Sequence, residues 1–198
     1  MYRFIETIKI LDGIFYRLEF HQMRMNICSK LFYPDADFIH LQSALTDSHS
    51  PQSGLFKCKV TFSSEILKIE YFPYKKRKIN SLCIVPTEIE SLPYKKEDRK
   101  DYNAAFGMRG NCDDVLLLKN GLLTDTSICN IAFFDGRCWL TPTKPLIYGV
   151  NRASLLEEGK IIEKDIKLDE LKKFSNVRLF NAMIEFGEIE LKIRDIHI

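Results

Sequence analysis

The chain has 198 residues, a formal net charge of +2 at neutral pH, and 45% hydrophobic and 28% charged residues. This length fits one domain or two small ones that share a core, and the composition is ordinary for a soluble globular protein. The low net charge argues against a dedicated nucleic-acid surface, because the one basic tract, 74–78, is typical of a solvated turn between strands.

The six cysteines form no Cys-x-x-Cys pair and show no zinc-ligand spacing, so we expect no metal site. Several lie inside apolar runs, as buried thiols do, and we expect them to be reduced in a cytoplasmic protein. The first residues lack the apolar segment of a signal peptide, and no apolar stretch approaches the length of a membrane span. We therefore expect neither a nucleic-acid nor a membrane partner.

The first part of the chain combines strand and helix signals. Runs rich in β-branched and aromatic residues predict strands at 4–10, 14–18, 55–62, 66–71 and 79–85. Residues 11–13, with the sequence Leu-Asp-Gly, predict a hairpin turn between the first two strands. Apolar residues at helical spacing predict a helix over 20–32, which Pro34 ends, and a second short helix is expected over 38–45.

The stretch 86–93 predicts a linker, after which the pattern begins again. Turn residues separate segments that predict strands at 115–118, 122–124, 128–134, 177–181 and 189–193. Helices are expected over 98–108, 151–158 and 168–174. The sequence therefore predicts an α+β protein of two mixed domains, residues 1–90 and 91–198.

Asp125 and Gly149 combine two features of a site for a flat, phosphorylated heterocycle. Asp125 places a lone carboxylate just inside a predicted strand, and Gly149 leads a turn into a predicted helix. The carboxylate could face a ring nitrogen, while backbone N–H groups at the start of the helix face the phosphate. Taken alone, Asp125 is better explained as an aspartate that ends a strand with a turn hydrogen bond.

The run 121–136, followed by Thr141-Pro142 and 146–152, closely resembles the second half of the class IV aminotransferases. These fold-type IV pyridoxal-phosphate enzymes include branched-chain aminotransferase, D-amino-acid aminotransferase and aminodeoxychorismate lyase. The resemblance extends over about residues 4–190 and implies the two-domain fold-type IV architecture with a shortened N-terminal domain. It also implies pyridoxal 5'-phosphate as cofactor, bound between the two domains.

The resemblance implies a role for one lysine of the tract 94–99. On the residues alone this tract is a solvated charge run, in which either Lys95 or Lys96 could point inward. Class IV enzymes carry their Schiff-base lysine just after the interdomain linker, and in the lyase branch an arginine follows four residues later. Lys95 and Arg99 match that spacing, so Lys95 is predicted to be the Schiff-base lysine and catalytic base.

The resemblance also implies two contacts between the C-terminal half of the chain and the cofactor. Asp125 matches a family glutamate that keeps the pyridine nitrogen protonated, although its side chain is one methylene shorter. The segment from Gly149 to Arg152 matches a Gly-Ile-Thr-Arg turn whose central N–H groups, here those of Val150 and Asn151, hold the cofactor phosphate. Asn151 replaces the usual threonine, whose hydroxyl contact is either lost or taken over by the amide.

Two further motifs are predicted to reach the phosphate. The sequence His-Gln-Met-Arg over 21–24 matches a His-x-x-Arg motif on the family's first helix, which makes Arg24 a phosphate ligand. Asn181-Ala182 resembles a turn of the lyase branch that also lies at the phosphate. Arg24, Lys95, Asp125 and Gly149 follow one another in the family's order and at similar intervals.

The resemblance implies a small-molecule amino substrate and a homodimer. We expect a 4-amino-4-deoxychorismate lyase reaction of folate biosynthesis, which releases pyruvate and 4-aminobenzoate. An aminotransferase of branched-chain or D-amino acids is the alternative. A degenerate, non-catalytic protein that binds pyridoxal phosphate or a partner subunit is the second alternative.

Overall fold

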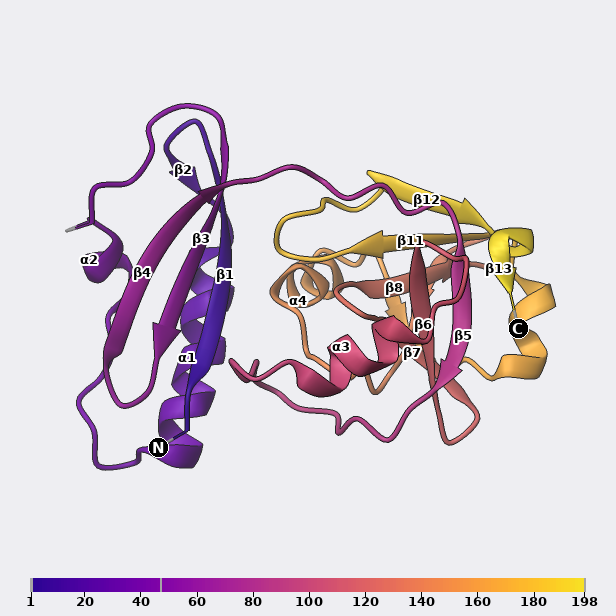
Figure 1. Ribbon diagram of the computed structural model, residues 1–198, viewed down its shortest axis with the longest axis horizontal. Helices are drawn as coiled ribbons and strands as arrows, with labels where there is room; N and C mark the ends of the chain where they lie inside the picture. The colour runs from indigo at the N-terminus through magenta and orange to yellow at the C-terminus, as the bar shows by residue number, and fades with distance from the viewer. Residues whose placement is uncertain (1, 47, 198) are drawn as a thin grey trace. The chain divides into compact units, whose positions relative to one another are not determined.

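The computed structural model describes residues 2–46 and 48–197, and it comprises two compact units (Figure 1). The first unit consists of Met1–Lys76 with Pro93–Asp98, and the second of Arg77–Leu92 with Arg99–Ile198. The chain therefore crosses between the units after Lys76, after Leu92 and after Asp98. A division into two domains at residue 90 stays a prediction.

The first unit is one four-stranded sheet with a helix against it. The strands lie in the order β2-β1-β3-β4, and the bounds are β1 Phe4–Leu11, β2 Ile14–Phe15, β3 Leu55–Phe62 and β4 Ile66–Pro73. The helices are α1, Leu18–Phe32, which contacts β1, and α2, Leu41–Thr46. β1 and β3 pair antiparallel along their full lengths, from Phe4 opposite Phe62 to Leu11 opposite Leu55.

The hairpin turn predicted at 11–13 is confirmed, because Asp12 and Gly13 have φ of 49° and 80° between β1 and β2. The second strand is much shorter than predicted. Leu18 already begins α1, after a left-handed Arg17 with φ 57° that turns the chain out of the sheet. The short helix α2 begins at Leu41 rather than at residue 38.

The second unit contains two sheets. The first has the order β13-β5-β6-β7, with β5 Leu82–Pro86, β6 Asp114–Lys119, β7 Leu122–Thr126 and β13 Ile196–His197. The second has the order β10-β9-β8-β11-β12, with β8 Asn130–Phe134, β9 Trp139–Thr141, β10 Ile162–Glu163, β11 Asn176–Phe180 and β12 Ile189–Lys192. The helical segments are α3 Lys100–Gly107, α4 Val150–Glu157, η1 Leu168–Lys173 and η2 Ile193–Asp195.

A helix packs against each of these sheets. Ala105 of α3 lies in one buried cluster with residues of the first sheet and its flanking loop, namely Val85, Val115, Leu117 and Leu146. Leu155 of α4 lies in a second cluster with residues at the other sheet, Ala132, Ile161 and Phe180. Only residues 127–129 separate β7 of the first sheet from β8 of the second. The end of β7 therefore lies close to the start of β8.

The sequence predictions for the second unit missed its shortest strands. The helix predicted over 168–174 is present as the 3₁₀ segment η1. The strands β9, β10 and β13 were not predicted, because two or three residues carry too little periodicity. β10 and β13 pair in parallel with strands distant in sequence, β9 and β5.

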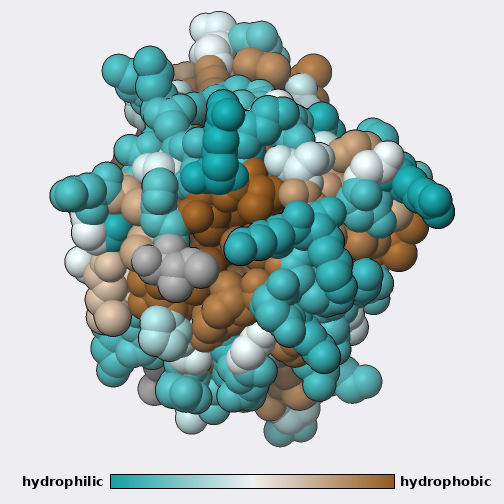
Figure 2. Space-filling model, turned by 90° about the vertical axis from the view of Figure 1, so that its right-hand side faces the viewer, coloured by the Kyte–Doolittle hydropathy of each residue, from teal (hydrophilic) through white to brown (hydrophobic). Residues whose placement is uncertain are grey.

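Figure 2 shows the end of the second unit that carries β5 and β13, where apolar side chains gather in the middle of a hydrophilic surface.

All six cysteines are free thiols, and Cys28, Cys58 and Cys129 are buried. Among the described residues, no group of three or more His, Cys, Asp or Glu side chains could hold a metal ion. Within 2–46 and 48–197 there is also no helix of sufficient length and apolar character to cross a bilayer.

Candidate active site

Asp125 is a buried carboxylate whose two oxygens both accept hydrogen bonds. It lies on β7 and is 4% exposed. Oδ1 accepts from Asn130 Nδ2 at 2.9 Å, and Oδ2 accepts from the backbone N–H groups of Leu146 and Ile147 at 2.7 and 3.0 Å. A carboxylate offers about four acceptor positions, so these donors leave room for one more.

The charge of Asp125 is poorly compensated. Burial raises its pKa to about 6, even though the hydrogen bonds oppose the shift, and Arg152 adds only a weak favourable charge. A protonated ring nitrogen would supply both a further donor and the positive charge. The remaining acceptor position and the uncompensated charge of Asp125 are therefore compatible with the pyridine ring of pyridoxal phosphate.

The start of α4 has backbone donors without partners inside the helix. Gly149 precedes the helix with an extended backbone and no side-chain cap, and the first bond of the helix runs from Ala153 N–H to its carbonyl oxygen at 2.9 Å. The N–H groups of 150–152 lie before that bond and have no partner inside the helix. Such an end favours an anion, as the predicted phosphate contact of Val150 and Asn151 requires.

The side chain of Asn151 connects this helix to the turn that follows β11. Its Nδ2 donates to the carbonyl oxygens of Asn181 and Ile184, at 2.9 and 3.1 Å. Asn181 Oδ1 in turn accepts from the N–H groups of Met183 and Ile184, at 2.8 and 3.0 Å. The Asn181-Ala182 turn thus lies beside the start of α4, as the predicted phosphate site needs, and the Asn151 amide holds the turn.

The same turn is tied to the loop that follows Asp125. Asn181 Nδ2 donates to Ile128 O at 3.1 Å and contacts Cys129 Sγ at 3.4 Å. Within that loop, Thr126 Oγ1 accepts from the N–H groups of Ile128 and Cys129, at 3.3 and 2.9 Å. The carboxylate, the helix start and the turn therefore form one connected region of the second unit.

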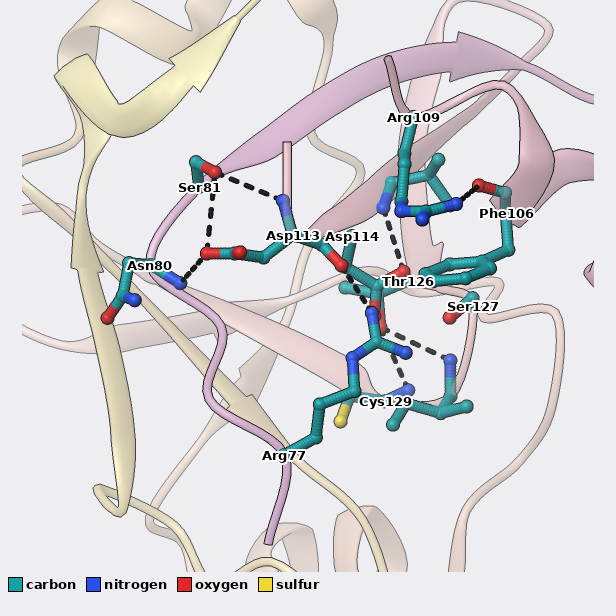
Figure 3. Close-up of polar contacts among 12 residues, drawn as sticks. Arg77, Asn80, Ser81, Phe106, Arg109, Asp113, Asp114, Thr126, Ser127 and Cys129 are labelled. Carbon is teal, nitrogen blue, oxygen red and sulfur yellow. Dashed lines mark hydrogen bonds and ion pairs between the residues drawn. The ribbon is translucent and has the colours of Figure 1, made fainter. Parts of the chain in front are cut away.

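A polar network supports the end of the first sheet where β5 and β6 begin and β7 ends (Figure 3). Asp113 Oδ2 accepts from the N–H of Asn80 at 2.7 Å and from Ser81 Oγ at 3.5 Å. The Ser81 hydroxyl also accepts from the N–H of Asp113 at 3.1 Å. These contacts hold the segment that enters β5 against the start of β6.

Two arginines contact the ring of Phe106 in this network, as Figure 3 shows. Arg77 lies 4.4 Å from the ring centroid and pairs with the fully buried Asp114, Nη2 to Oδ2, at 3.2 Å. Arg109 lies 4.0 Å from the same centroid and donates to the Phe106 carbonyl oxygen at 3.1 Å. The network thereby fixes the end of α3 to the end of the sheet where β6 begins and β7 runs into the loop 127–129.

Arg99, whose spacing from Lys95 suggested the lyase branch, lies in the second unit. Its guanidinium is 3.6 Å from the centroid of the Tyr102 ring, and Nη2 donates to Ser127 O at 3.0 Å. Arg99 therefore supports the loop after Asp125. Lys95 belongs to the first unit, so the four-residue spacing spans a crossing between the units.

Lys95 lies beside β1 in the first unit. Its carbonyl oxygen accepts from the N–H of Ile5 at 2.9 Å, and the N–H of Glu97 donates to Arg3 O at 3.1 Å. Lys95 Nζ donates to Thr7 Oγ1 at 3.1 Å, and its side chain is partly buried, whereas Lys96 is exposed. Both lysines belong to the segment that pairs with β1, and Lys95 is the more sheltered of the two.

Arg24 is held by an acid that the sequence analysis did not identify. Its Nε and Nη2 donate to Glu6 Oε1 and Oε2 at 2.8 and 2.5 Å. His21 Nδ1 shares Oε2, also at 2.5 Å, and all three side chains are buried. Burial alone would raise the pKa of Glu6, but the charge of Arg24 and the hydrogen bond to His21 lower it to about 2.

Two signals in the sequence could have pointed to these supporting residues. Glu6 occupies the same face of its strand as Phe4, Ile8 and Ile10, and a charge at an inward position calls for a buried partner. Asn130 is the first residue of β8 and binds Asp125. A polar residue at the start of an apolar strand is a weaker signal, because it also suits a turn.

The chain matches the model of the amino-transferase class IV family over residues 3–190. A Haemophilus influenzae protein described as uncharacterized is 32% identical over 185 residues, which cover 92% of this chain and 98% of that protein. The solved structure of a candidate 4-amino-4-deoxychorismate lyase from Haemophilus somnus is 28% identical, with a TM-score of 0.82 over 93% of this chain and 98% of that one. A candidate amino-acid aminotransferase from Mesorhizobium loti shares the fold at 23% identity, with a TM-score of 0.79 over 97% and 99% of the two chains.

The family match spans nearly the whole chain, and the relatives are covered almost completely. The predicted fold class and family resemblance are therefore confirmed. The chain belongs to the class IV aminotransferases, and it is a pyridoxal-phosphate-dependent enzyme of that family.

Proposed function

We propose that this enzyme is a 4-amino-4-deoxychorismate lyase, which releases pyruvate and 4-aminobenzoate. The observation that carries the proposal is the near-complete alignment with the Haemophilus somnus structure, which is described as a candidate for that activity. The spacing of Lys95 and Arg99 and the Asn181-Ala182 turn favour the same branch of the family. A role in folate biosynthesis and a cytoplasmic location belong to this proposal.

The residues that bind the cofactor are proposed as follows. Asp125 faces the ring nitrogen, since its buried carboxylate has acceptor capacity left and its charge is poorly compensated. The N–H groups of Val150 and Asn151, after Gly149, bind the phosphate together with the Asn181-Ala182 turn. Arg24 adds a charge-assisted contact. Its Nε–Nη2 edge is oriented by Glu6.

Each group then has a defined part in the reaction. Pyridoxal phosphate, when bound, supplies an electron sink for the α-carbon of an amino substrate. Lys95 Nζ would hold the cofactor in the resting enzyme, and as a free amine it would accept the α-proton of the substrate. The Asp125 carboxylate keeps a proton on the ring nitrogen, because a charged partner offsets the cost of its burial. The Thr7 hydroxyl is uncharged; it accepts a hydrogen bond from Lys95 Nζ and so orients the amine.

The fate of the cofactor tests the reaction. A lyase regenerates pyridoxal phosphate at every turnover and needs no keto acid. We expect the purified protein to release pyruvate and 4-aminobenzoate from aminodeoxychorismate with no keto acid added, over many turnovers. An inert aminodeoxychorismate, together with conversion of bound cofactor to pyridoxamine phosphate by common amino acids, would replace this proposal by the aminotransferase alternative.

The aminotransferase alternative, acting on branched-chain or D-amino acids, uses the same residues up to proton removal. It differs only after proton removal, because the lyase expels a β-substituent of the substrate whereas the aminotransferase transfers the amino group. Replacing Lys95 therefore cannot separate the two reactions. The second alternative, a non-catalytic pyridoxal-phosphate-binding or partner protein, is disfavoured because the chain belongs to an enzyme family. Retention of Arg24, Lys95 and Asp125 in the family's order argues against it.

A further inference from the structure

Asn130 connects two parts of the candidate site that the sequence separates. It begins β8 and is 6% exposed. Its Nδ2 donates to Asp125 Oδ1 and to Ile147 O, both at 2.9 Å. One amide group thus joins the carboxylate of β7 to the segment that runs into α4.

The other atom of the same amide lies against Gly149. A Cβ built at Gly149 would stand 2.0 Å from Asn130 Oδ1 and 3.2 Å from its Cγ. The backbone of Gly149, with φ −72° and ψ 144°, is open to any residue, so the glycine is required by this close approach and not by its conformation. Asn130 is therefore packed directly against Gly149, the residue before α4.

We propose that Asn130 is a positioning residue that sets the separation between the Asp125 carboxylate and the start of α4. The inference rests on the proposed cofactor roles of those two groups. The ring nitrogen and the phosphate of pyridoxal phosphate are joined by a rigid ring and a short link. Protein groups that bind both ends must therefore be held at a matching separation before the cofactor arrives.

The chemistry of the amide suits this role. Nδ2 supplies two donors, which Asp125 and Ile147 use, and Oδ1 occupies the space that any side chain at position 149 would need. An aspartate at 130 would place a second carboxylate beside Asp125, and an alanine would leave Asp125 Oδ1 without this donor. A side chain that only filled the space at position 130 would not need both the Nδ2 donor and a fixed orientation of the amide.

The first test uses the cofactor-free protein. The titration of Asp125 is followed by ¹³C NMR of its carboxyl group in the natural sequence and in Asn130→Ala. Because Asn130 donates to the charged form, its removal should move the pKa of Asp125 above the natural value of about 6. An unmoved titration would show that Asn130 does not control this carboxylate, and would overturn the inference.

The second test is a double-mutant cycle on pyridoxal-phosphate affinity. Asn130→Ala and Gly149→Ala should each weaken binding about tenfold, the first by losing a buried hydrogen bond and the second by the clash. With Asn130 already replaced, Gly149→Ala should cost less than about twofold, because the atom it strikes is gone. Independent, multiplicative losses would overturn the inference.

Asn176→Ala is the matched control, since Asn176 lies on the adjacent strand β11, opposite Phe134 of β8, and contacts Glu190 at the surface. It should leave both the Asp125 titration and the cofactor affinity unchanged. If Asn130→Ala does not fold, Asn130→Ser serves in both tests, because its hydroxyl is too short to span Asp125 and Ile147.

The outcomes separate this inference from the proposed reaction. A protein that binds pyridoxal phosphate but does not cleave aminodeoxychorismate would contradict the lyase proposal and leave the double-mutant cycle valid. A natural protein with no affinity for the cofactor would contradict both, whatever the titration of Asp125 showed. Normal lyase activity with a multiplicative cycle would contradict the positioning role alone.

Discussion

Glu6 holds the guanidinium of Arg24 by two contacts, Oε1 to Nε at 2.8 Å and Oε2 to Nη2 at 2.5 Å, with both side chains buried. Arg24, which is expected to bind the cofactor phosphate, is therefore held along one edge of its guanidinium by the Glu6 carboxylate of the same unit. This pairing orients the guanidinium before any ligand is present, and it makes the stability of the first unit depend on the charge of Glu6.

Glu6→Gln should destabilise the protein and change its response to acid. Removing one partner of a buried pair costs about 3–5 kcal/mol, because the other charge stays buried. The pKa of Glu6 is lowered from 4.5 to about 2, so its contribution is complete above about 4.5 and is lost as pH falls towards 2. Among the described residues, Arg24, His21 and Cys28 interact electrostatically with Glu6.

Urea unfolding at several pH values checks this prediction. Between pH 5 and 2 the natural protein should lose more stability than Glu6→Gln does. Glu70→Gln is the control, since Glu70 pairs with Lys68 at the surface. Equal stability of Glu6→Gln and the natural protein at pH 7 would contradict the buried-pair interpretation.

Arg24→Ala should weaken pyridoxal-phosphate binding by about tenfold to a hundredfold, since a charge-assisted contact is worth roughly 1.5–3 kcal/mol. Affinity for pyridoxal, which lacks the phosphate, should change little, and this comparison separates a lost contact from a damaged fold. Arg194→Ala, at a highly exposed side chain, is the control. Equal losses for both ligands would show that Arg24 does not reach the phosphate.

Lys95→Ala should abolish the covalent attachment of the cofactor, whereas Lys96→Ala should retain it. The Lys95 side chain is partly buried and donates to Thr7, whereas Lys96 is exposed. Borohydride reduction followed by peptide mass spectrometry locates the adduct. An adduct on Lys96, or on neither lysine, would refute the assignment.

Cofactor affinity should depend on the protonation of Asp125. Its pKa is raised from 3.8 to about 6, so below about pH 6 the carboxyl must lose a proton before it can face a protonated ring nitrogen. Affinity measured at pH 5.5 should be lower than at pH 7.5 in the natural protein, and Asp125→Asn should weaken binding and reduce this difference. The same pH dependence in Asp125→Asn would assign it to another group.

The protein is predicted to be a two-fold dimer, since its class IV resemblance implies a homodimer and a chain this short gains core by pairing. Sedimentation at micromolar concentration should give about twice the chain mass of 23.1 kDa. A single species of 23.1 kDa would count against the dimer.

The sequence alone determined the family, the hairpin at 11–13 and most of the longer strands and helices. These features depend on local information. Asp12-Gly13 has the turn chemistry of a tight hairpin, and apolar residues at helical spacing located α1. That spacing did not identify the inward face of α1, because Met23, Ile27 and Leu31 are exposed, whereas the buried residues of the helix are His21, Arg24, Met25 and Cys28. The order of Arg24, Lys95, Asp125 and Gly149 along the chain was likewise sufficient to recognise the class IV pattern.

Only the tertiary structure decided what these residues contact. Glu6 and Arg24 are 18 positions apart, and Asp125 meets the N–H groups of Leu146 and Ile147 across 21 and 22 positions. The short strands β9, β10 and β13 depend on their neighbours in the same way. Hydrogen bonds between groups so far apart in the chain exist only when packing brings them together, and no local propensity encodes that distance.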